Sequence, residues 1–172
     1  MRYLLHSLIP SLVLSITALA PAFGASGSSP VPDVTYRVII PDGGGDSAVV
    51  RVKAVIPKGW HIQSNAPLDE FLIPTELNVT GEGLRLGKVS FPAPQLQEFP
   101  ALGGQVALFS DTVDIFVTAY ATKASKANKG KQDAKALAAA LAKASVALRY
   151  QACNDSQCLP PKTVTARQTP AR

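Results

Sequence analysis

Short stretches in which apolar and polar residues alternate recur along this chain, and they constrain its fold more than any other feature. In residues 48–56, Val50 and Val52 alternate with Arg51 and Lys53, as in a strand with one buried face. Further short strands are expected at residues 34–40, 74–80, 84–91, 106–109, 112–121, 145–150 and 163–165, with turn-forming residues between them. Strands of this length and spacing predict an all-β sandwich.

Residues 91–121 allow a more detailed prediction. Three prolines and two glycines make the segment from Phe91 to Gly104 loop-like. Beyond it, the strands at 106–109 and 112–121 are expected to form a hairpin around Ser110 and Asp111.

Residues 123–144, rich in alanine and lysine, interrupt the strand pattern. The first half of this insertion is hydrophilic and low in complexity, and the second half contains good helix formers, with Asp133 as a candidate N-cap. We expect a solvated insertion with a short helix. The alternative is a lysine-driven contact with an acidic partner or a membrane surface.

The beginning of the chain reads as a targeting segment. Arg2 precedes an almost wholly apolar run at residues 4–20, and small residues follow. This pattern predicts a signal peptide at 1–24, cleaved after Gly24; an uncleaved membrane anchor is the alternative. A flexible leader (25–33) and one domain (34–168) would remain. The net charge of +5 is mild and much of the basic excess lies in the insertion, so we expect no nucleic-acid binding.

The only two cysteines lie in the stretch from Tyr150 to Pro161, YQACNDSQCLPP. Asn154 and Asp155 favour a turn between them, so Cys153 and Cys158 would flank a tight connection where a disulfide can close. In an exported chain, such a pair is either a structural bridge or a redox pair. Closing so short a loop stabilises a fold by only about 2 kcal/mol, and a short exposed bridge is easily reduced. Both interpretations stay open on the residues alone.

Other chemistry finds little support in the sequence. Beyond the signal segment the sole histidine is His61, which we interpret as a structural or solvent-edge residue, and a cysteine or serine hydrolase would need a base beside its nucleophile. The cysteines and His61 are too few for a tetrahedral zinc site, although two thiolates could bind copper(I). We expect no cofactor and no metal. Thiol–disulfide exchange is the chemistry that these residues support directly.

Three segments together resemble the family of the N-terminal periplasmic domain of the thiol:disulfide interchange protein DsbD. They are YQACNDSQCLPP, the pair GWHIQSN (59–65) and LIPTEL (72–77), and FPAPQLQEFP (91–100). The resemblance covers about residues 47–166. It implies an immunoglobulin-like β-sandwich whose cysteine pair lies on a hairpin at one edge and cycles between dithiol and disulfide.

The resemblance also implies roles for individual residues. Cys158 would form the mixed disulfide with partners, and Cys153 would resolve it. Phe99 would shield the pair as part of a cap, Glu98 would influence thiol ionisation, and Tyr150 would line the site. Many family caps carry two adjacent acids, whereas Gln97 precedes Glu98 here.

Partners and location follow from the same resemblance. Electrons would come from a membrane-embedded thiol reductase and pass to thioredoxin-like proteins or disulfide isomerases in the periplasm. The mature chain would be a monomer that does not span the membrane. The competing hypothesis is a non-catalytic exported binding or adaptor module, in which the same sandwich carries a structural disulfide.

Overall fold

The fold is seen for four ranges of the chain. The computed structural model describes residues 30–41, 47–99, 103–122 and 131–170. The predicted signal peptide (1–24), most of the leader and the hydrophilic first half of the insertion lie outside the described residues.

The first layer of the molecule is a five-stranded sheet in the order β12-β1-β2-β8-β5. Only the contact between β1 and β12 is parallel. Leu84, Leu86 and Val89 of β5 are partly buried against the core. The step from Leu86 to Val89 breaks the strict alternation, and the pairing with β8 is irregular at the same place. The strands are β1 (Asp33–Ile39), β2 (Ser47–Val55), β5 (Leu84–Ser90), β8 (Thr112–Ala121) and β12 (Arg167–Gln168).

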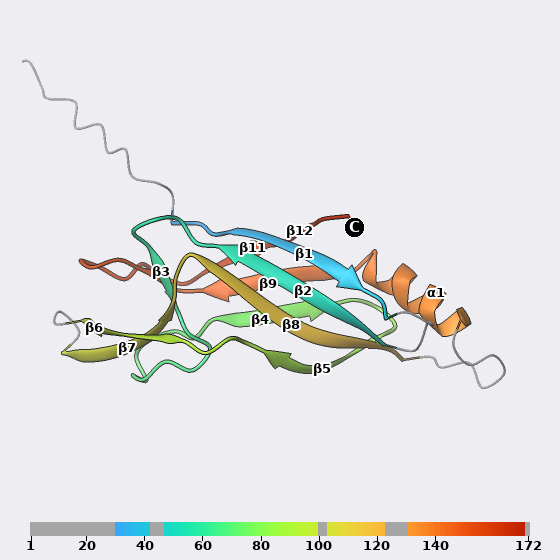
Figure 1. Cartoon of the computed structure of the whole chain (residues 1–172), viewed down its shortest axis with the longest axis horizontal. Helices are drawn as coiled ribbons and strands as arrows, with labels where there is room; N and C mark the ends of the chain where they lie inside the picture. Colours follow the sequence, from blue (N-terminus) through green and yellow to red (C-terminus); the bar gives the residue numbers. More distant parts are fainter. Residues whose placement is uncertain (1–29, 42–46, 100–102, 123–130, 171–172) are drawn as a thin grey trace, which may run out of the picture.

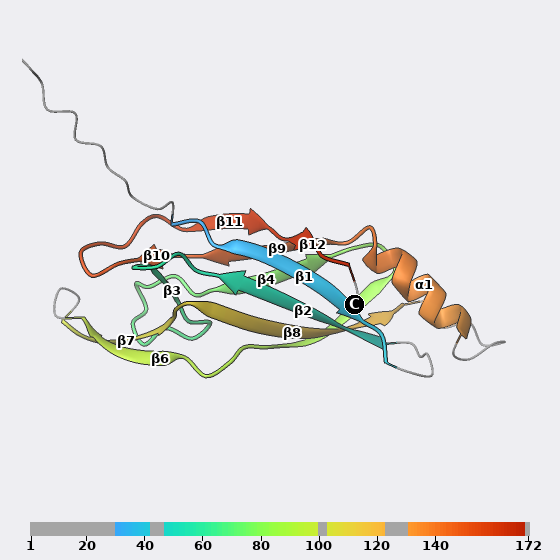
Figure 2. The ribbon, with the colours of Figure 1, turned by 45° about the horizontal axis from the view of Figure 1, so that its top comes forward.

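A second sheet, in the order β11-β9-β4, forms the other layer (Figures 1 and 2). Alternate residues of both sheets point inward, so that Val50 and Val52 of β2 and Leu148 of β9 are fully buried in one shared core. The strands are β4 (Glu76–Thr80), β9 (Ser145–Tyr150) and β11 (Lys162–Thr165). The predicted all-β, immunoglobulin-like sandwich is confirmed.

A third, four-stranded sheet lies at one end of the sandwich, in the order β10-β3-β7-β6 (Figure 1). Ile62, Phe109 and Ala152 continue the main core on one of its faces. The opposite face carries the cysteine site. The strands are β3 (His61–Gln63), β6 (Gln95–Phe99), β7 (Gly104–Phe109) and β10 (Ala152–Cys153).

The prediction of a hairpin around Ser110 and Asp111 was wrong. β7 pairs with β3 and β6, whereas β8 pairs with β2 and β5. Asp111 has a left-handed backbone (φ 57°), and its carbonyl accepts a hydrogen bond from the amide of Ile56 (2.7 Å). The turn therefore passes the chain from the third sheet to the first.

The segment from Phe91 to Gly104 is not entirely loop-like, because it contains β6. This strand pairs with β7 from Gln95 opposite Leu108 to Phe99 opposite Gly104. It lies at the edge of its sheet, which is where flanking prolines are tolerated since one side needs no hydrogen-bond donors.

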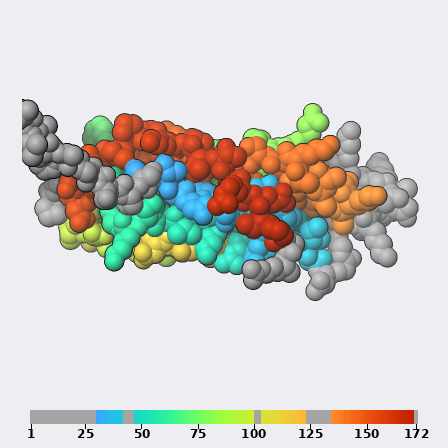
Figure 3. Space-filling view, turned by 90° about the horizontal axis from the view of Figure 1, so that it is seen from above, coloured from blue at the N-terminus to red at the C-terminus, as the bar shows by residue number. Residues whose placement is uncertain are grey.

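The insertion ends in helix α1 (Lys131–Leu141) at the end of the molecule opposite the cysteine loop (Figures 1 and 3). Asp133 lies within this helix and therefore is not its N-cap. Leu137 and Leu141 are buried to 0% and 1% exposure, so the second half of the insertion belongs to the core rather than to a solvated excursion. No helix in the four described ranges is long and apolar enough to cross a bilayer.

Candidate functional site

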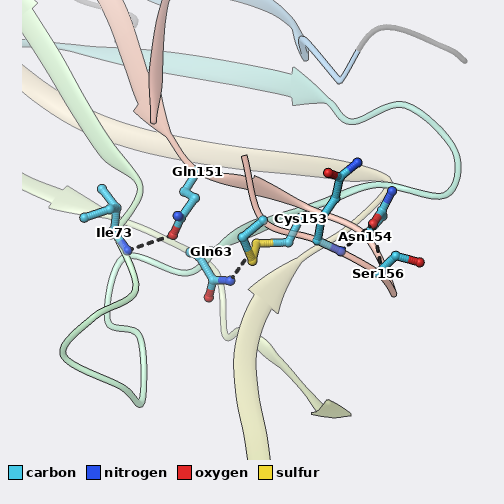
Figure 4. The surroundings of a disulfide bond; sticks show 8 residues. Gln63, Ile73, Gln151, Cys153, Asn154 and Ser156 are labelled. Atoms are coloured by element: carbon cyan, nitrogen blue, oxygen red, sulfur yellow. Dashed lines mark hydrogen bonds between the residues drawn. A yellow bond between two sulfur atoms is a disulfide. The ribbon is translucent and has the colours of Figure 1, made fainter. Parts of the chain in front are cut away.

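A disulfide joins Cys153 to Cys158 across a small closed loop (Figure 4). β9 and β11 bracket the loop, as the sequence predicted. The side-chain oxygen of Asn154 accepts hydrogen bonds from the amides of Ser156 (3.0 Å) and Gln157 (2.9 Å), which is the way an asparagine stabilises a turn. The Asn154 amide also donates to the Gln157 carbonyl (2.9 Å). The local sequence thus holds the two cysteines together.

The two cysteines differ in exposure. Cys153 has no exposed surface. Cys158 is half-buried, and the loop residues before it are exposed. Within the described residues, Cys158 is thus the more accessible half of the disulfide.

β3 places two buried polar side chains beside Cys153. His61 lies directly opposite Cys153 in the antiparallel pairing, so the two side chains emerge on the same face of the sheet. Gln63, two residues along, shares that face, and its Nε2 donates a hydrogen bond to Cys153 Sγ (3.3 Å; Figure 4). His61 is 6% exposed and Gln63 is fully buried.

Phe99 lies over the same face as His61. Their rings meet edge to face, with centroids 4.9 Å apart, and Phe99 packs with Leu72, Val106 and Leu108. Phe99 pairs with Gly104 of β7, whereas Ile62, the neighbour of His61, pairs with Phe109. The two pairings are five residues apart along β7. Five residues of straight strand span about 17 Å, so β6 and β7 must bend toward His61.

The other two predicted site residues lie apart from the sulfurs. Glu98 accepts a hydrogen bond from the side chain of Gln105 (3.1 Å) on the exposed surface, and strand alternation puts it on the opposite face of β6 from Phe99. Tyr150 is 2% exposed and packs in the main core. The structure therefore brings Phe99, but not Glu98, to the face of Cys153; the functional roles of these residues stay predictions.

Burial controls the ionisation of the titratable groups in this region. Desolvation lowers the pKa of His61, and the negative charge of Asp155 opposes part of that shift. The imidazole is therefore neutral near pH 7. Its Nε2 is buried without a hydrogen-bond partner within the described residues. Burial likewise raises the pKa of Tyr150.

The structure offers no additional ligands for a metal site among the described residues. Groups of three or more histidine, cysteine or carboxylate side chains do not come together anywhere in the described part of the chain.

Sequence reasoning missed Gln63 altogether and placed His61 only as a structural or edge residue. The signal that could have found them is alternation. In His61-Ile62-Gln63, the apolar middle residue points into the core, so the two polar residues must share the other face. Which strand lies opposite them depends on pairing between residues about 90 positions apart, and the sequence gives no sign of that.

Comparison with known proteins adds the family. None of the curated proteins matches the sequence. Among solved structures, the N-terminal periplasmic domain of ScsB from Proteus mirabilis is 12% identical, with a TM-score of 0.45 over 77% of this chain and 44% of that chain. This chain thus spans less than half of that protein. The Neisseria meningitidis DsbD N-terminal domain in the reduced form is 17% identical, with a TM-score of 0.40 over 77% of this chain and 82% of that one.

The family match covers most of the chain, including every strand of the three sheets. Residues 30–170 match the family described as "Thiol:disulfide interchange protein DsbD, N-terminal". The chain therefore belongs to the family of DsbD N-terminal domains.

Proposed function

We propose that this protein is an exported electron relay that accepts reducing equivalents from a membrane-embedded thiol reductase and passes them to thioredoxin-like or isomerase acceptors. The apolar segment at residues 4–20 supports export to the periplasm with cleavage after Gly24. The relay acts as a monomer and uses no cofactor.

The observation that carries this proposal is the unequal burial of the two cysteines. Because Cys158 is half-buried and Cys153 is fully buried, an incoming thiolate reaches Cys158 Sγ. Its attack forms a disulfide between partner and Cys158 and breaks the Cys153–Cys158 bond, and the electron pair stays on Cys153 Sγ. The second thiol of the donor then displaces Cys158, which leaves the donor oxidised and both cysteines reduced.

Delivery to an acceptor reverses these steps. The Cys158 thiolate attacks the acceptor disulfide and forms a mixed disulfide. Cys153, held beside Cys158 by the Asn154 turn, then attacks Cys158 Sγ and releases the reduced acceptor. Each half-reaction transfers two electrons and needs no group other than the thiols.

The test combines a reduction potential with partner trapping. A relay should be reduced rapidly by a thioredoxin-like dithiol, at a potential near those of exchange proteins, and should keep its fold in both states. Cys153→Ser should accumulate a mixed disulfide through Cys158, and the matched Cys158→Ser should not. A potential well below about −300 mV, with no trapped species, would overturn the relay and favour the adaptor module with a structural disulfide.

A further inference from the structure

The buried sulfur of Cys153 has one polar contact within the described residues, and it comes from Gln63. The amide Nε2 lies 3.3 Å from Sγ, and both residues have no exposed surface. Gln63 occupies the position opposite Gln151, next to the His61–Cys153 pair, so its side chain reaches diagonally to the sulfur (Figure 4).

The backbone fixes Gln63 firmly in this position. Its amide donates to the carbonyl of Gln151 (3.1 Å), and its carbonyl accepts a hydrogen bond from the hydroxyl of Thr75. β3 is also paired with β10 on one side and with β7 on the other, so the backbone that directs the side chain to the sulfur is held on both sides.

This arrangement costs stability, which indicates a purpose other than packing. Gln63 Oε1 is buried without a partner in the described residues, and an unpaired buried amide oxygen is unfavourable. A disulfide sulfur is also a weak acceptor, so the hydrogen bond contributes little stability while the bridge is closed.

We propose that Gln63 is a positioning residue that stabilises Cys153 as the leaving thiolate when a partner attacks Cys158. As the Cys153–Cys158 bond breaks, its electron pair moves to Cys153 Sγ in a site without solvent. Hydrogen bonds to a charged acceptor are stronger than those to a neutral one, so the same Nε2–H contact strengthens as the charge develops. No proton has to reach the buried sulfur in this step.

The inference rests on the proposed relay for its biological meaning. Its test measures the ionisation of the Cys153 thiol alone and needs no exchange partner. In the Cys158→Ser variant, the Cβ carbon resonance of Cys153 reports thiolate formation as pH rises. Gln63→Met, which keeps the length of the side chain and removes the donor, should raise the Cys153 pKa, with a fall in its acid dissociation constant of about tenfold, as expected for one hydrogen bond to a charge. His61 lies opposite Cys153, and Asp155 acts electrostatically on His61; neither residue is changed.

Gln151→Met is the matched control. This glutamine lies opposite Gln63, but its side-chain oxygen accepts from the amide of Ile73 (3.0 Å) rather than facing the sulfur. It should leave the Cys153 pKa unchanged. In the protein with both cysteines, and at a pH above the Cys153 pKa where the reduced sulfur is a thiolate, Gln63→Met should also shift the equilibrium with glutathione about tenfold toward the disulfide, which is about 30 mV.

A folded Gln63→Met variant with an unchanged Cys153 pKa would overturn the inference, and so would an equal shift in Gln151→Met. If Gln63→Met does not fold, the Gln63 side-chain amide protons in the Cys158→Ser variant supply the answer: they should titrate together with Cys153, and their failure to move would overturn the inference. Failure of the relay itself would appear instead as absent exchange with dithiol proteins, even with the Cys153 pKa dependent on Gln63.

Discussion

The imidazole of His61 meets the ring of Phe99 edge to face, with 4.9 Å between ring centroids and 69° between planes. This contact joins the edge strand β6 to β3, the strand that pairs with Cys153. The pairings along β7 place the two residues several positions apart, so the contact is not one between directly paired residues. Phe99 is 5% exposed. The Phe99 ring thus shares with His61 the face of the third sheet on which Cys153 lies.

Removal of the Phe99 ring should expose this face of the third sheet. We expect Phe99→Ala to destabilise the fold by about 3 kcal/mol, typical of a buried phenylalanine truncation, and to speed reduction of the disulfide by dithiothreitol severalfold because small thiols gain access. Stopped-flow reduction and urea unfolding measure the two effects. Leu96→Ala is the control, since Leu96 lies on the other face of the same strand and is 58% exposed. An unchanged reduction rate in folded Phe99→Ala would contradict the shielding role.

The two thiols should react at different rates once the protein is reduced. Cys158 is half-buried and Cys153 is fully buried, and alkylation requires an accessible thiolate. We expect brief treatment with iodoacetamide to label Cys158 at least tenfold faster than Cys153, as measured by peptide mass spectrometry. Denatured protein provides the control, in which both should label at similar rates. Preferential labelling of Cys153 would reverse the proposed order of attack.

Stability should depend on pH through His61. Because burial lowers the pKa of His61 below its usual 6.5, the unfolded chain binds a proton there in acid that the folded protein does not bind. The stability associated with neutral His61 is therefore complete above about pH 6.5 and is lost as pH falls from there through the lowered folded pKa. His61→Gln should flatten this part of the profile, measured by urea unfolding between pH 7.5 and pH 5. An equally steep loss of stability in the variant would assign it to other groups.

The sequence was sufficient for the features that depend on neighbouring residues. Alternation along β2 predicted its buried face, and the turn-forming Asn154 predicted that the cysteines would flank a closed loop. Features that depend on distant pairing were missed. The alternation in β7 is the same whether β8 or β3 lies beside it. The predicted hairpin therefore paired β7 with the wrong strand. The prolines around β6 indicated a loop because they mark both loops and edge strands.

The helix and the cysteine site show the same limit at the level of side chains. The Ala/Lys composition predicted a helix, yet burial of Leu137 depends on the surface that the sandwich offers. For Gln63, residue type indicated no role, and only the pairing of β3 with β10 brings its amide to a sulfur. The cysteines were recognisable because their chemistry is evident from residue type, whereas the groups that support them are defined by position.

The turn at Asn154 should control how readily the disulfide forms. Its side-chain oxygen accepts two backbone hydrogen bonds that close the loop, and each is worth about 1 kcal/mol in favourable cases. Asn154→Ala should loosen the reduced loop, lower the effective concentration of one thiol at the other, and shift the glutathione equilibrium toward the dithiol by about fivefold or more. Ser156→Ala is the matched control, because Ser156 contributes only its backbone amide to the turn. If Asn154→Ala and Ser156→Ala gave the same equilibrium constant as the unmodified protein, closure of the loop would have to come from the β10 and β11 pairings alone.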